Sequence, residues 1–483
     1  MIKAGQDESK VFSVNPYSGE TGWEHPATTE AEIEGMFASA RRAQRDWARA
    51  PHASRIAVVK AFADVVERRA DELAHLISYE AGKPRWEAAV EVNSLRTKLP
   101  ASVEAFEARS VGFSREVRGM TSRTRFLPHG VFAVLGPFNF PASMPNSHIM
   151  PALLAGNAVV FKPSELTPRT GQLMAEMWAE AGLPAGLLCV AFGGRHVGET
   201  LVHHRGHDGV LFIGSHAAGL KILEALAGQP DKLVALEMGG NSPLVVWDYD
   251  DLDAAVHTIV QSTFVTGGQR CTAARRLIVQ EGDDRLIGRL AEVLQSVQVG
   301  SYESDPEPFY GPLIRPSAAA RVLDRQRELT AGGGVPLLEA EVSGPWQTLV
   351  SPGLIDVTTA ENDRDEEIFG PMLKVYRVPT LEEAVRRCNA TVFGLAAGIV
   401  CRSEDVFASF ALDVKAGIVN WNQQLTGATA FAPFGGVKQS GNSRSAGYVS
   451  ADYCSYPIAS FELPAPRFPD TLNPGLSFPN HKG

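Results

Sequence analysis

Residues 157–194 read "NAVVFKPSELTPRTGQLMAEMWAEAGLPAGLLCVAFGG". A short apolar run ends at Lys162, an amphipathic stretch covers residues 170–182, and a second apolar run leads into Gly193 and Gly194. Short buried strands that alternate with helices are typical of a parallel sheet covered by helices on both faces. The stretch therefore predicts a strand–helix–strand unit of a doubly wound α/β fold.

The same alternation runs through the chain after residue 130. Further apolar runs fall at residues 130–137, 209–215, 232–240, 242–248, 274–280 and 416–421. Residues 30–110 differ, because their apolar residues recur at three- and four-residue spacing. There we expect long amphipathic helices over 31–48 and 54–82, the second ending at Gly82. The pattern predicts an α/β protein with two doubly wound parallel-sheet domains.

The composition is that of a soluble globular protein. Of the 483 residues, 44% are hydrophobic and 21% are charged, and the formal net charge is −10. An acidic chain without a basic block argues against nucleic acid as a partner. The N-terminus lacks an apolar signal segment, and the longest apolar stretch, residues 149–161, is interrupted and too short to span a bilayer. Five scattered cysteines favour a reducing compartment, so we expect a cytoplasmic protein without a membrane partner.

One cysteine has an unusual setting. Cys271 follows two glycines in "TGGQRCTAARRL" (266–277) and is flanked by Arg270, Arg275 and Arg276. A buried structural thiol rarely needs such surroundings. A nucleophile needs a loop that admits substrate and an environment that favours the thiolate. Cys271 is therefore the candidate nucleophile, although the two later arginines have the simpler interpretation that they begin the next strand.

Two further side chains have the chemistry to assist such a thiol. Glu237 ends the apolar run of "LVALEMGGNSP", where burial should raise its pKa and suit it to general base catalysis. Asn139 lies in the rigid turn "GPFNFP" (136–141), where its amide can donate to a developing oxyanion. Each has an ordinary alternative: a salt-bridged strand end for Glu237, and a turn amide bonded to its own backbone for Asn139.

Polar groups at two other predicted strand ends indicate a nucleotide site. Lys162, Ser164 and Glu165 follow one strand, and Gly214 and Ser215 end another. Ligands of such sheets bind at the carboxyl ends of the strands, where a helix N-terminus accommodates phosphate. The spacing is not GxGxxG, and a glycine after a strand is most often a simple turn.

The segment "EEIFGP" (366–371) adds an acid and an aromatic ring. Glu367 has the chemistry to accept from a ribose hydroxyl, and Phe369 offers a ring face, although an exposed acidic turn is the alternative. The histidine-rich segment "HHRGHDG" (203–209) does not have the ligand spacing of a zinc site. We therefore expect catalysis without a metal.

Six motifs, "GPFNFP", "FKPSE", "LEMGGNSP", "GQRCT", "EEIFGP" and "PFGGVKQSG", occur in an order and spacing that resemble the NAD(P)-dependent aldehyde dehydrogenase superfamily. The resemblance runs from about residue 15 to about residue 460. It implies that Cys271 is the nucleophile, Glu237 the general base, and Asn139 the oxyanion donor together with the Cys271 backbone N–H. It implies cofactor binding by Lys162, Ser164, Glu165, Gly214, Ser215, Glu367 and Phe369.

The resemblance also implies a domain division and an assembly. Residues 1–113 and 131–238 would form the NAD-binding domain and residues 239–450 the catalytic domain. Residues 114–130 and 451–483 would form an oligomerisation hairpin and a C-terminal strand and tail, so we expect a homodimer or homotetramer. NAD is favoured over NADP because a carboxylate at Glu165 accepts from a ribose 2′-OH but repels a 2′-phosphate.

The expected substrate is a small aldehyde, and the expected product is its acid. Glu237 favours the hydrolytic, non-acylating branch of the superfamily. The segments 136–165 and 417–444 most resemble members that oxidise succinylglutamate semialdehyde, whose two carboxylates require cations or polar donors. Lys98 and Arg444 are the candidates. Three alternatives stay open: an aromatic or other uncharged aldehyde, a thioester-forming acyl transferase or esterase, and a coenzyme-binding protein without turnover.

Three positions depart from the superfamily pattern. Phe138 stands where many members have tryptophan, and Asn241 stands where lysine is common. After "SGNSR" the chain reads "SAGYVS" and lacks an acid that many members carry there. Water activation is therefore expected to depend on Glu237 more directly or on ordered solvent.

Overall fold

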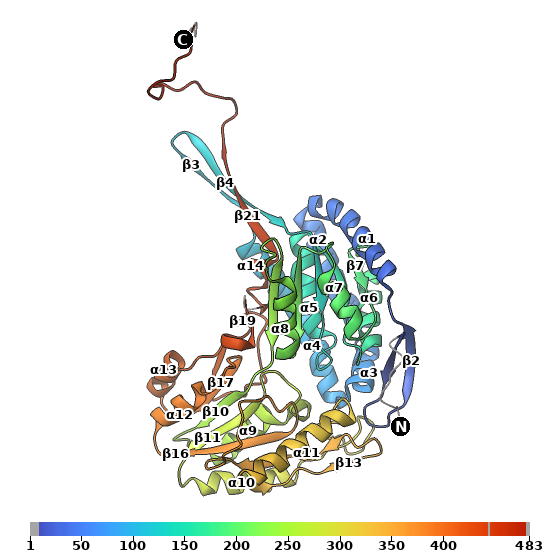
Figure 1. The fold of residues 1–483 in the computed structure, drawn as a ribbon, viewed down its shortest axis with the longest axis vertical. Helices are drawn as coiled ribbons and strands as arrows, with labels where there is room; N and C mark the ends of the chain where they lie inside the picture. The colour runs from blue at the N-terminus through green and yellow to red at the C-terminus, as the bar shows by residue number, and fades with distance from the viewer. Residues whose placement is uncertain (1–8, 443–444, 480–483) are drawn as a thin grey trace.

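The computed structural model describes residues 9–442 and 445–479. Two α/β lobes lie one above the other in Figure 1, and a narrow β arm projects from the upper lobe. Along the described residues, no helix combines the length and apolar character that crossing a membrane requires.

The upper lobe is built on a parallel five-stranded sheet. Its strand order is β7-β6-β5-β8-β9, and every pairing in it is parallel. The strands are β5 (Val131–Leu135), β6 (Ala158–Lys162), β7 (Leu188–Val190), β8 (Gly209–Gly214) and β9 (Leu233–Met238). The intervening helices are α5 (Ser143–Ala155), α6 (Pro168–Glu180), α7 (Arg195–His203) and α8 (His216–Leu226). The strand–helix–strand unit predicted at 157–194 is therefore confirmed as β6-α6-β7.

Four helices precede this sheet; the first packs against its strands, and the other three pack against the helices that cover it. They are α1 (Glu30–Arg49), α2 (His52–Arg68), α3 (Ala70–Ala81) and α4 (Arg85–Arg109), and a hairpin of β1 (Lys10–Val14) and β2 (Thr21–Pro26) lies before them. Helix α1 begins with a capping box in which Thr29 and Glu32 satisfy each other's backbone N–H groups. Val59, Phe62, Leu73 and Ile77 are fully buried in the same core as the strands.

The prediction of one helix over residues 54–82 was wrong. The helix breaks at Arg69, whose φ of −109° and ψ of 22° are not helical, and α3 then ends at Gly82 with a left-handed φ of 71°. The Arg69 side chain pairs with Glu72 at 2.7 Å and with Glu180 of α6 at 3.4 Å. The break lets α2 and α3 each bury an apolar face, a tertiary effect that the local spacing does not report.

The lower lobe contains a seven-stranded sheet of order β12-β15-β16-β11-β10-β17-β18. The strands are β10 (Ser242–Val246), β11 (Ala274–Gln280), β12 (Val335–Leu338), β15 (Gly353–Asp356), β16 (Met372–Val378), β17 (Ala396–Val400) and β18 (Ile418–Trp421). All pairings are parallel except that of the edge strand β12 with β15. The predicted fold class, two parallel doubly wound sheets, is confirmed, with one antiparallel edge strand added.

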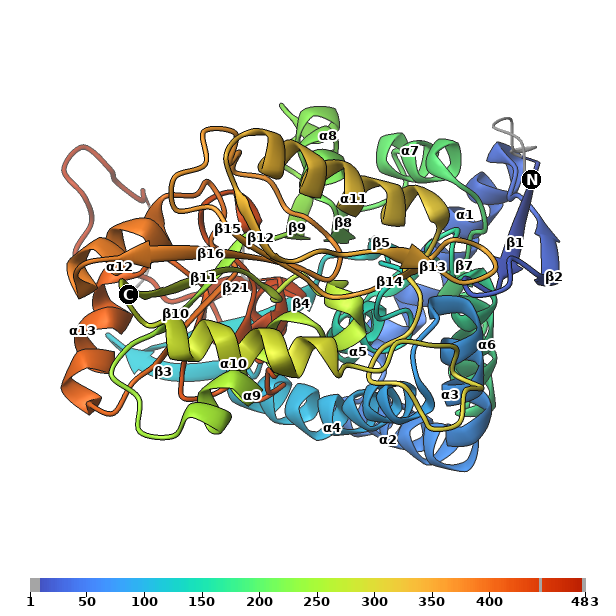
Figure 2. The same ribbon diagram turned by 90° about the horizontal axis from the view of Figure 1, so that it is seen from below.

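Helices cover both faces of this second sheet. They are α9 (Leu252–Thr263), α10 (Asp284–Gln295), α11 (Pro316–Ala331), α12 (Leu381–Asn389) and α13 (Glu404–Asp413). Figure 2 shows α11 on one side of the sheet and α9 and α10 on the other. Two separate apolar clusters correspond to the two faces, one containing Val322 and Phe410 and the other Ile259 and Leu290.

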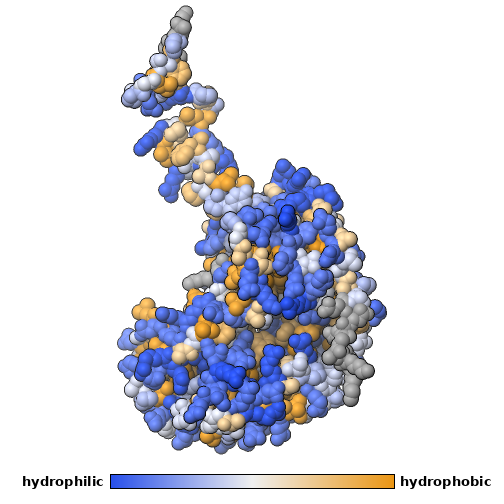
Figure 3. All heavy atoms as spheres, viewed as in Figure 1, coloured by the Kyte–Doolittle hydropathy of each residue, from blue (hydrophilic) through white to orange (hydrophobic). Residues whose placement is uncertain are grey.

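The arm is a three-stranded antiparallel sheet of order β21-β4-β3. It consists of β3 (Phe113–Val117), β4 (Met120–Pro128) and the late strand β21 (Ser455–Glu462), which follows the short helix α14 (Ser450–Tyr453). The arm carries exposed apolar side chains, including Phe113, Ile458 and Phe461 (Figure 3). The role predicted for it, like the predicted roles of the two lobes, stays a prediction.

The remaining elements are short. They are β13 (Val342–Ser343), β14 (Leu349–Val350), β19 (Pro433–Phe434), β20 (Ala446–Gly447) and 3-10 turns at Val265–Gly268 and Lys438–Ser440. The first of these turns leads directly into the loop that carries Cys271.

Candidate active site

A cavity of about 840 Å³ brings most of the predicted residues together. Both lobes contribute to its walls. The predicted residues that line it are Asn139, Ser164, Glu165, Gly214, Ser215, Glu237, Cys271, Glu367 and Phe369. Such a volume suits a cofactor and a small substrate.

Backbone conformation, more than open space, explains the glycines before Cys271. Thr266, Gly267 and Gly268 have φ values of 61°, 58° and 70°, so three successive residues adopt a left-handed backbone conformation. A Cβ on Gly268 would lie 2.3 Å from the carbonyl oxygen of Gly370. Gly268 is therefore needed for the close packing of two loops. It does not serve to open the site to ligand.

The thiol of Cys271 is half-buried, and its pKa lies well above the ordinary value because burial and the nearby Glu237 and Glu367 carboxyls disfavour the thiolate. The flanking arginines do not offset this. Arg270 pairs with Glu87 at 2.8 Å, and Arg275 donates mainly to backbone carbonyl groups. The expected environment that favours the thiolate is therefore absent around Cys271 in this state.

Glu237 lies one residue before the end of β9 with its side chain in the cavity, and it interacts directly with the Cys271 thiol. Burial raises the pKa of Glu237 to about 8, and the charge of Glu367 acts in the same direction. One of its carboxyl oxygens, Oε1, is buried without a hydrogen-bond partner. The carboxyl is thus mostly protonated at pH 7 and becomes a base as the pH rises through 8.

The second carboxyl, Glu367, enters the site through a gap left by a glycine. A Cβ on Gly239 would lie 1.9 Å from Glu367 Oε2, and the Gly240 N–H donates to Oε1 at 3.1 Å. Burial raises the pKa of Glu367 to about 7, while the Arg275 charge lowers it.

Asn139 points toward the loop that carries the thiol. Its Nδ2 donates to the carbonyl oxygen of Gln269 at 2.9 Å, and its side chain is buried beside the cavity. The predicted alternative, an amide bonded within its own turn, is not the observed arrangement, because Gln269 is distant in sequence. An amide held in this way is a pre-oriented donor.

Asn139→Ala is expected to lower kcat for aldehyde oxidation by about 10²–10³-fold, the usual cost of one lost oxyanion donor, with a small change in KM. Steady-state kinetics of the variant measure this. Asn146→Ala is the matched control, because its buried amide donates to Ala142 O and not to the nucleophile loop. An equal loss of kcat in both variants would contradict the assignment.

The residues predicted to bind a nucleotide lie at the ends of β6 and β8, on one side of the cavity. Lys162 is almost buried, and its Nζ lies 3.5 Å from Glu165 Oε2, whose side chain is 46% exposed. Ser215 caps α8 by accepting from the Ala218 N–H, so the α8 N-terminus borders the cavity. A Cβ on Gly219 would come within 2.3 Å of Met238 Sδ, so glycine is needed for α8 to pack against β9. An exposed acid near a helix N-terminus fits a ribose next to a phosphate.

The comparisons with known proteins agree with this geometry. The sequence profile of the aldehyde dehydrogenase family matches residues 2–457. The chain belongs to the aldehyde dehydrogenase family. It is 47% identical over 475 residues to N-succinylglutamate 5-semialdehyde dehydrogenase of Pseudomonas fluorescens, covering 98% of this chain and 97% of that protein. It is 49% identical over 470 residues to N-succinylglutamate 5-semialdehyde dehydrogenase 1 of Caulobacter vibrioides, covering 96% and 99%.

Solved structures of aldehyde dehydrogenases have the same fold. An NAD-dependent aldehyde dehydrogenase from Sinorhizobium meliloti superposes with a TM-score of 0.90 at 30% identity, covering 95% of this chain and 93% of that one. An NADP-dependent glyceraldehyde-3-phosphate dehydrogenase from Bacillus halodurans superposes with a TM-score of 0.87 at 29% identity, covering 95% and 96%. The family therefore includes similar proteins with either nicotinamide cofactor.

Of the two candidate carboxylate-binding cations in this aldehyde dehydrogenase, Lys98 lines the cavity and Arg444 lies outside the described residues. Lys98 Nζ donates to Ser147 Oγ at 2.7 Å and to the Ser143 carbonyl at 2.8 Å. Its third neighbour is Met144 Sδ at 3.7 Å, a weak acceptor. Burial lowers the pKa of Lys98 to about 8, so it remains mostly a cation at pH 7.

Sequence reasoning missed several charged residues that belong to this site. Arg315 and Arg321 line the cavity at the start of α11, where their sequence context is that of an ordinary surface helix. Glu91 also lines the cavity, and behind it Lys83 pairs with Glu91 at 2.7 Å and lies 3.6 Å from the centre of the Phe140 ring. No local spacing marks these residues, because their neighbours are distant in the chain.

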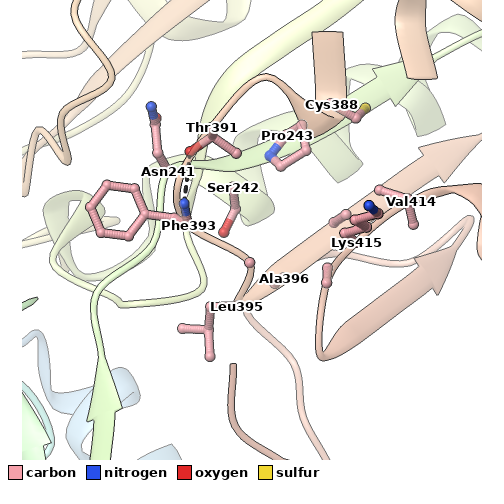
Figure 4. Close-up of a pocket in the computed structure, with 13 residues that line it drawn as sticks. Asn241, Ser242, Pro243, Cys388, Thr391, Phe393, Leu395, Ala396, Val414 and Lys415 are labelled. Carbon is pink, nitrogen blue, oxygen red and sulfur yellow. Dashed lines mark hydrogen bonds between the residues drawn. The ribbon is translucent and has the colours of Figure 1, made fainter. Parts of the chain in front are cut away.

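The departures from the family pattern have local explanations. Asn241 Nδ2 donates to Asp365 Oδ1 at 2.8 Å, and Phe138 packs edge-to-face on Phe369 with ring centres 5.9 Å apart. Figure 4 shows Asn241 at a second, very small cavity of about 10 Å³, bordered also by Phe393 and Lys415. That volume holds at most one water molecule, so it is not a ligand site.

The histidine-rich segment has structural contacts. His204 Nε2 lies 3.0 Å from Glu34 and its ring stacks on Phe37, while His207 Nε2 lies 2.9 Å from the Val202 carbonyl oxygen. Within residues 9–442 and 445–479, no group of three His, Cys, Asp or Glu side chains is arranged to hold a metal ion.

Proposed function

We propose that this aldehyde dehydrogenase oxidises succinylglutamate semialdehyde to the corresponding acid with NAD as the cofactor. The observation that carries the proposal is the shared cavity, which holds a thiol, a basic carboxyl and the Lys98 ammonium together. The similarity to relatives named for this substrate supports the choice of aldehyde.

The first step uses the coupled Cys271 and Glu237 side chains. Glu237, with its pKa raised by burial, accepts the thiol proton as the sulfur attacks the aldehyde carbon. The resulting thiohemiacetal carries an oxyanion, which the Asn139 amide and the Cys271 N–H stabilise. The burial that raises the thiol pKa makes this proton transfer necessary.

The residues at the ends of β6 and β8 fit a nicotinamide dinucleotide. Lys162 and Glu165 would hold the adenosine ribose, with Ser164 beside them, while Gly214 and Ser215 would face the pyrophosphate. Glu367 and Phe369 would hold the nicotinamide ribose and ring. The bound cofactor supplies a hydride acceptor, which allows the thiohemiacetal to become a thioester.

The thioester is then hydrolysed at the same thiol. After Glu237 has released the thiol proton to solvent, it takes a proton from a water molecule, and the water attacks the acyl carbon. The C–S bond then breaks, and the acid leaves as the Cys271 sulfur is released. A base in this position supports hydrolysis over transfer of the acyl group to coenzyme A, so we infer a non-acylating enzyme.

The proposed substrate is tested by following NADH absorbance with a panel of aldehydes: succinylglutamate semialdehyde, shorter semialdehydes, and aliphatic and aromatic aldehydes. We expect kcat/KM for succinylglutamate semialdehyde to exceed the others by orders of magnitude. Preference for an uncharged aldehyde would overturn the substrate assignment and leave the dehydrogenase. Acid released without stoichiometric NADH would favour the acyl transferase or esterase alternative.

Lys98→Met is expected to raise KM for succinylglutamate semialdehyde by about ten- to a hundredfold. The reason is that a charge-assisted hydrogen bond to a carboxylate contributes about 1.5–3 kcal/mol. A carboxylate would replace Met144 Sδ as the third acceptor of Lys98. Kinetics of the same variant with an uncharged aliphatic aldehyde provide the control, and an equal rise in both KM values would contradict a role in carboxylate recognition.

Glu165→Ser is expected to reduce the preference for NAD over NADP by about tenfold. Removing a partly exposed charge beside a 2′-phosphate relieves a repulsion of about 1 kcal/mol and also removes an acceptor for the 2′-OH. The ratio of kcat/KM values for the two cofactors is the measurement. Glu224→Ser, an exposed acid on α8, is the control and should leave the ratio unchanged.

We also infer that residues 1–113 and 131–238 form the cofactor-binding domain and that residues 239–450 form the catalytic domain. The arm of residues 114–130 and 451–483 is inferred to join subunits in a homodimer or homotetramer. Its exposed residues Phe113 and Phe461 support this, because the strand register places them on one face, and an isolated three-stranded sheet gains stability when an apolar face is covered.

A further inference from the structure

The Arg275 side chain connects two loops of the site. Arg275 is the second residue of strand β11 and is only 1% exposed. Its Nη1 donates to the Gly268 carbonyl at 2.6 Å, and its Nη2 donates to the Arg270 carbonyl at 3.0 Å. These two carbonyls belong to the loop that carries Cys271, so Arg275 holds the nucleophile loop by its backbone.

The same guanidinium also contacts the segment 367–370. Nη1 donates to the Gly370 carbonyl at 3.3 Å, and Nη2 lies 3.9 Å from Glu367 Oε1. Its Cζ lies 5.4 Å from the centre of the Phe369 ring. One planar cation therefore contacts a carbonyl, a carboxyl and an aromatic face of a loop about a hundred residues away.

The backbone between the two loops is shaped to fit this contact. Gly268 lacks the Cβ that would collide with the Gly370 carbonyl oxygen and lie 3.2 Å from Arg275 Nη1. Phe369 is held on its other side by the edge-to-face contact with Phe138. The position of Phe369 relative to Cys271 thus depends on a close-packed unit with Arg275 at its centre.

Arg276, the next residue, provides an internal comparison. It is equally buried, at 2% exposed, but the pairing of β11 with β10 shifts register at Arg275, and the two neighbouring guanidinium groups reach different segments. Its guanidinium donates to the carbonyls of Asn241, Arg387 and Cys388. None of these acceptors belongs to the nucleophile loop or to the segment 367–370.

We propose that Arg275 is a positioning residue that ties the nucleophile loop to the Glu367–Gly370 segment and so sets the separation between the Cys271 sulfur and the bound nicotinamide. The inference rests on the proposed function, in which Glu367 and Phe369 hold the nicotinamide. Hydride transfer requires this separation, because a misplacement of about 1 Å can cost about 10²-fold in rate. Ester hydrolysis at Cys271 needs no nicotinamide and does not depend on it.

The test compares two activities of the same thiol in the whole enzyme. Arg275→Lys keeps the positive charge, but the lysine ammonium lacks the planar guanidinium group and cannot donate to all of these acceptors at once. We expect it to lower the rate of NADH formation by about ten- to a hundredfold, while hydrolysis of p-nitrophenyl acetate stays within about threefold of wild type. With a substrate deuterated at the aldehyde carbon, the isotope effect on kcat should rise in this variant, because hydride transfer becomes rate-limiting.

Arg276→Lys is the matched control, because it makes the same change at an equally buried site on the same strand. It should leave the ratio of dehydrogenase to esterase activity and the isotope effect as in wild type. Arg275→Gln should lower the ratio further, and if that variant does not fold, Arg275→Lys alone carries the test.

Three outcomes separate this inference from the proposed function. If Arg275→Lys leaves the ratio of dehydrogenase to esterase activity unchanged, whether or not both activities fall, the positioning role is overturned while the dehydrogenase assignment stands. If the wild-type enzyme oxidises a different aldehyde, the ratio of dehydrogenase to esterase activity is measured with that aldehyde. That ratio then decides the inference. If no aldehyde yields NADH, the proposed function and this inference both fail.

Discussion

Cys271→Ala is expected to abolish NADH formation, with a loss of at least about 10⁴-fold in kcat, because Cys271 is the thiol proposed to form both the thiohemiacetal and the thioester. The residual rate should be close to that of the uncatalysed reaction under the assay conditions. NAD affinity, followed by quenching of protein fluorescence, should change little, since the residues proposed to hold the cofactor are unaltered. The two measurements together separate loss of chemistry from loss of binding.

Cys189→Ala is the matched control for this variant. Cys189 is the other half-buried thiol among the described cysteines, and it lies outside the cavity. Its removal should leave kcat within about twofold of wild type, as is usual for a small change away from a site. A Cys271→Ala enzyme that retains more than a tenth of the wild-type rate would place the nucleophile elsewhere.

Glu237→Gln is expected to separate the two halves of the reaction. Hydrolysis of the thioester loses its base, so steady-state turnover should fall by about 10²–10⁴-fold. A rapid-mixing experiment should still show NADH forming up to one equivalent per site before turnover slows, although the burst itself is slower because thiol deprotonation also loses Glu237. Mass spectrometry should then find the acyl group on the peptide that contains Cys271.

The pH profile gives a second measurement on Glu237. Its pKa of about 8 means that the carboxyl is protonated below pH 8 and that its base form grows as the pH rises through that value. Wild-type kcat should therefore increase between about pH 7 and 9, and this limb should be missing in Glu237→Gln. A variant that turns over without a burst, or that retains the wild-type limb, would show that another group activates water.

The resting state of the site follows from its burial. Cys271, Glu237 and Glu367 lie close together, and their pKa values are all raised chiefly because burial disfavours the charged forms. The charge of Glu367 raises the pKa values of Glu237 and Cys271 further. Arg275 is the buried cation that opposes this by lowering the pKa of Glu367. We infer that the thiol is protonated until substrate and cofactor enter, which protects it from reaction with other electrophiles.

Several features of the molecule followed from local sequence. The strand–helix–strand unit at 157–194 is explicit in its short apolar runs, and Gly82 marks the end of α3 because only a residue without a Cβ adopts that left-handed cap easily. The strand-end positions of Glu237 and Ser215 were likewise readable, since side chains at strand ends reach the carboxyl edge of a sheet. The fold class and the cavity residues that belong to the six motifs therefore follow from the linear pattern.

What that pattern does not contain is the pairing of segments distant in the chain. At the break, Arg69 pairs with Glu180 of another helix, and next to the thiol, Arg270 pairs with Glu87 of α4. The different contacts of Arg275 and Arg276, adjacent and chemically identical, arise only when β11 is placed between β10 and β16, where its pairing with β10 shifts register at Arg275. Burial and charge act through space, so the pKa values and the contacts that control the chemistry arise only when the chain is folded.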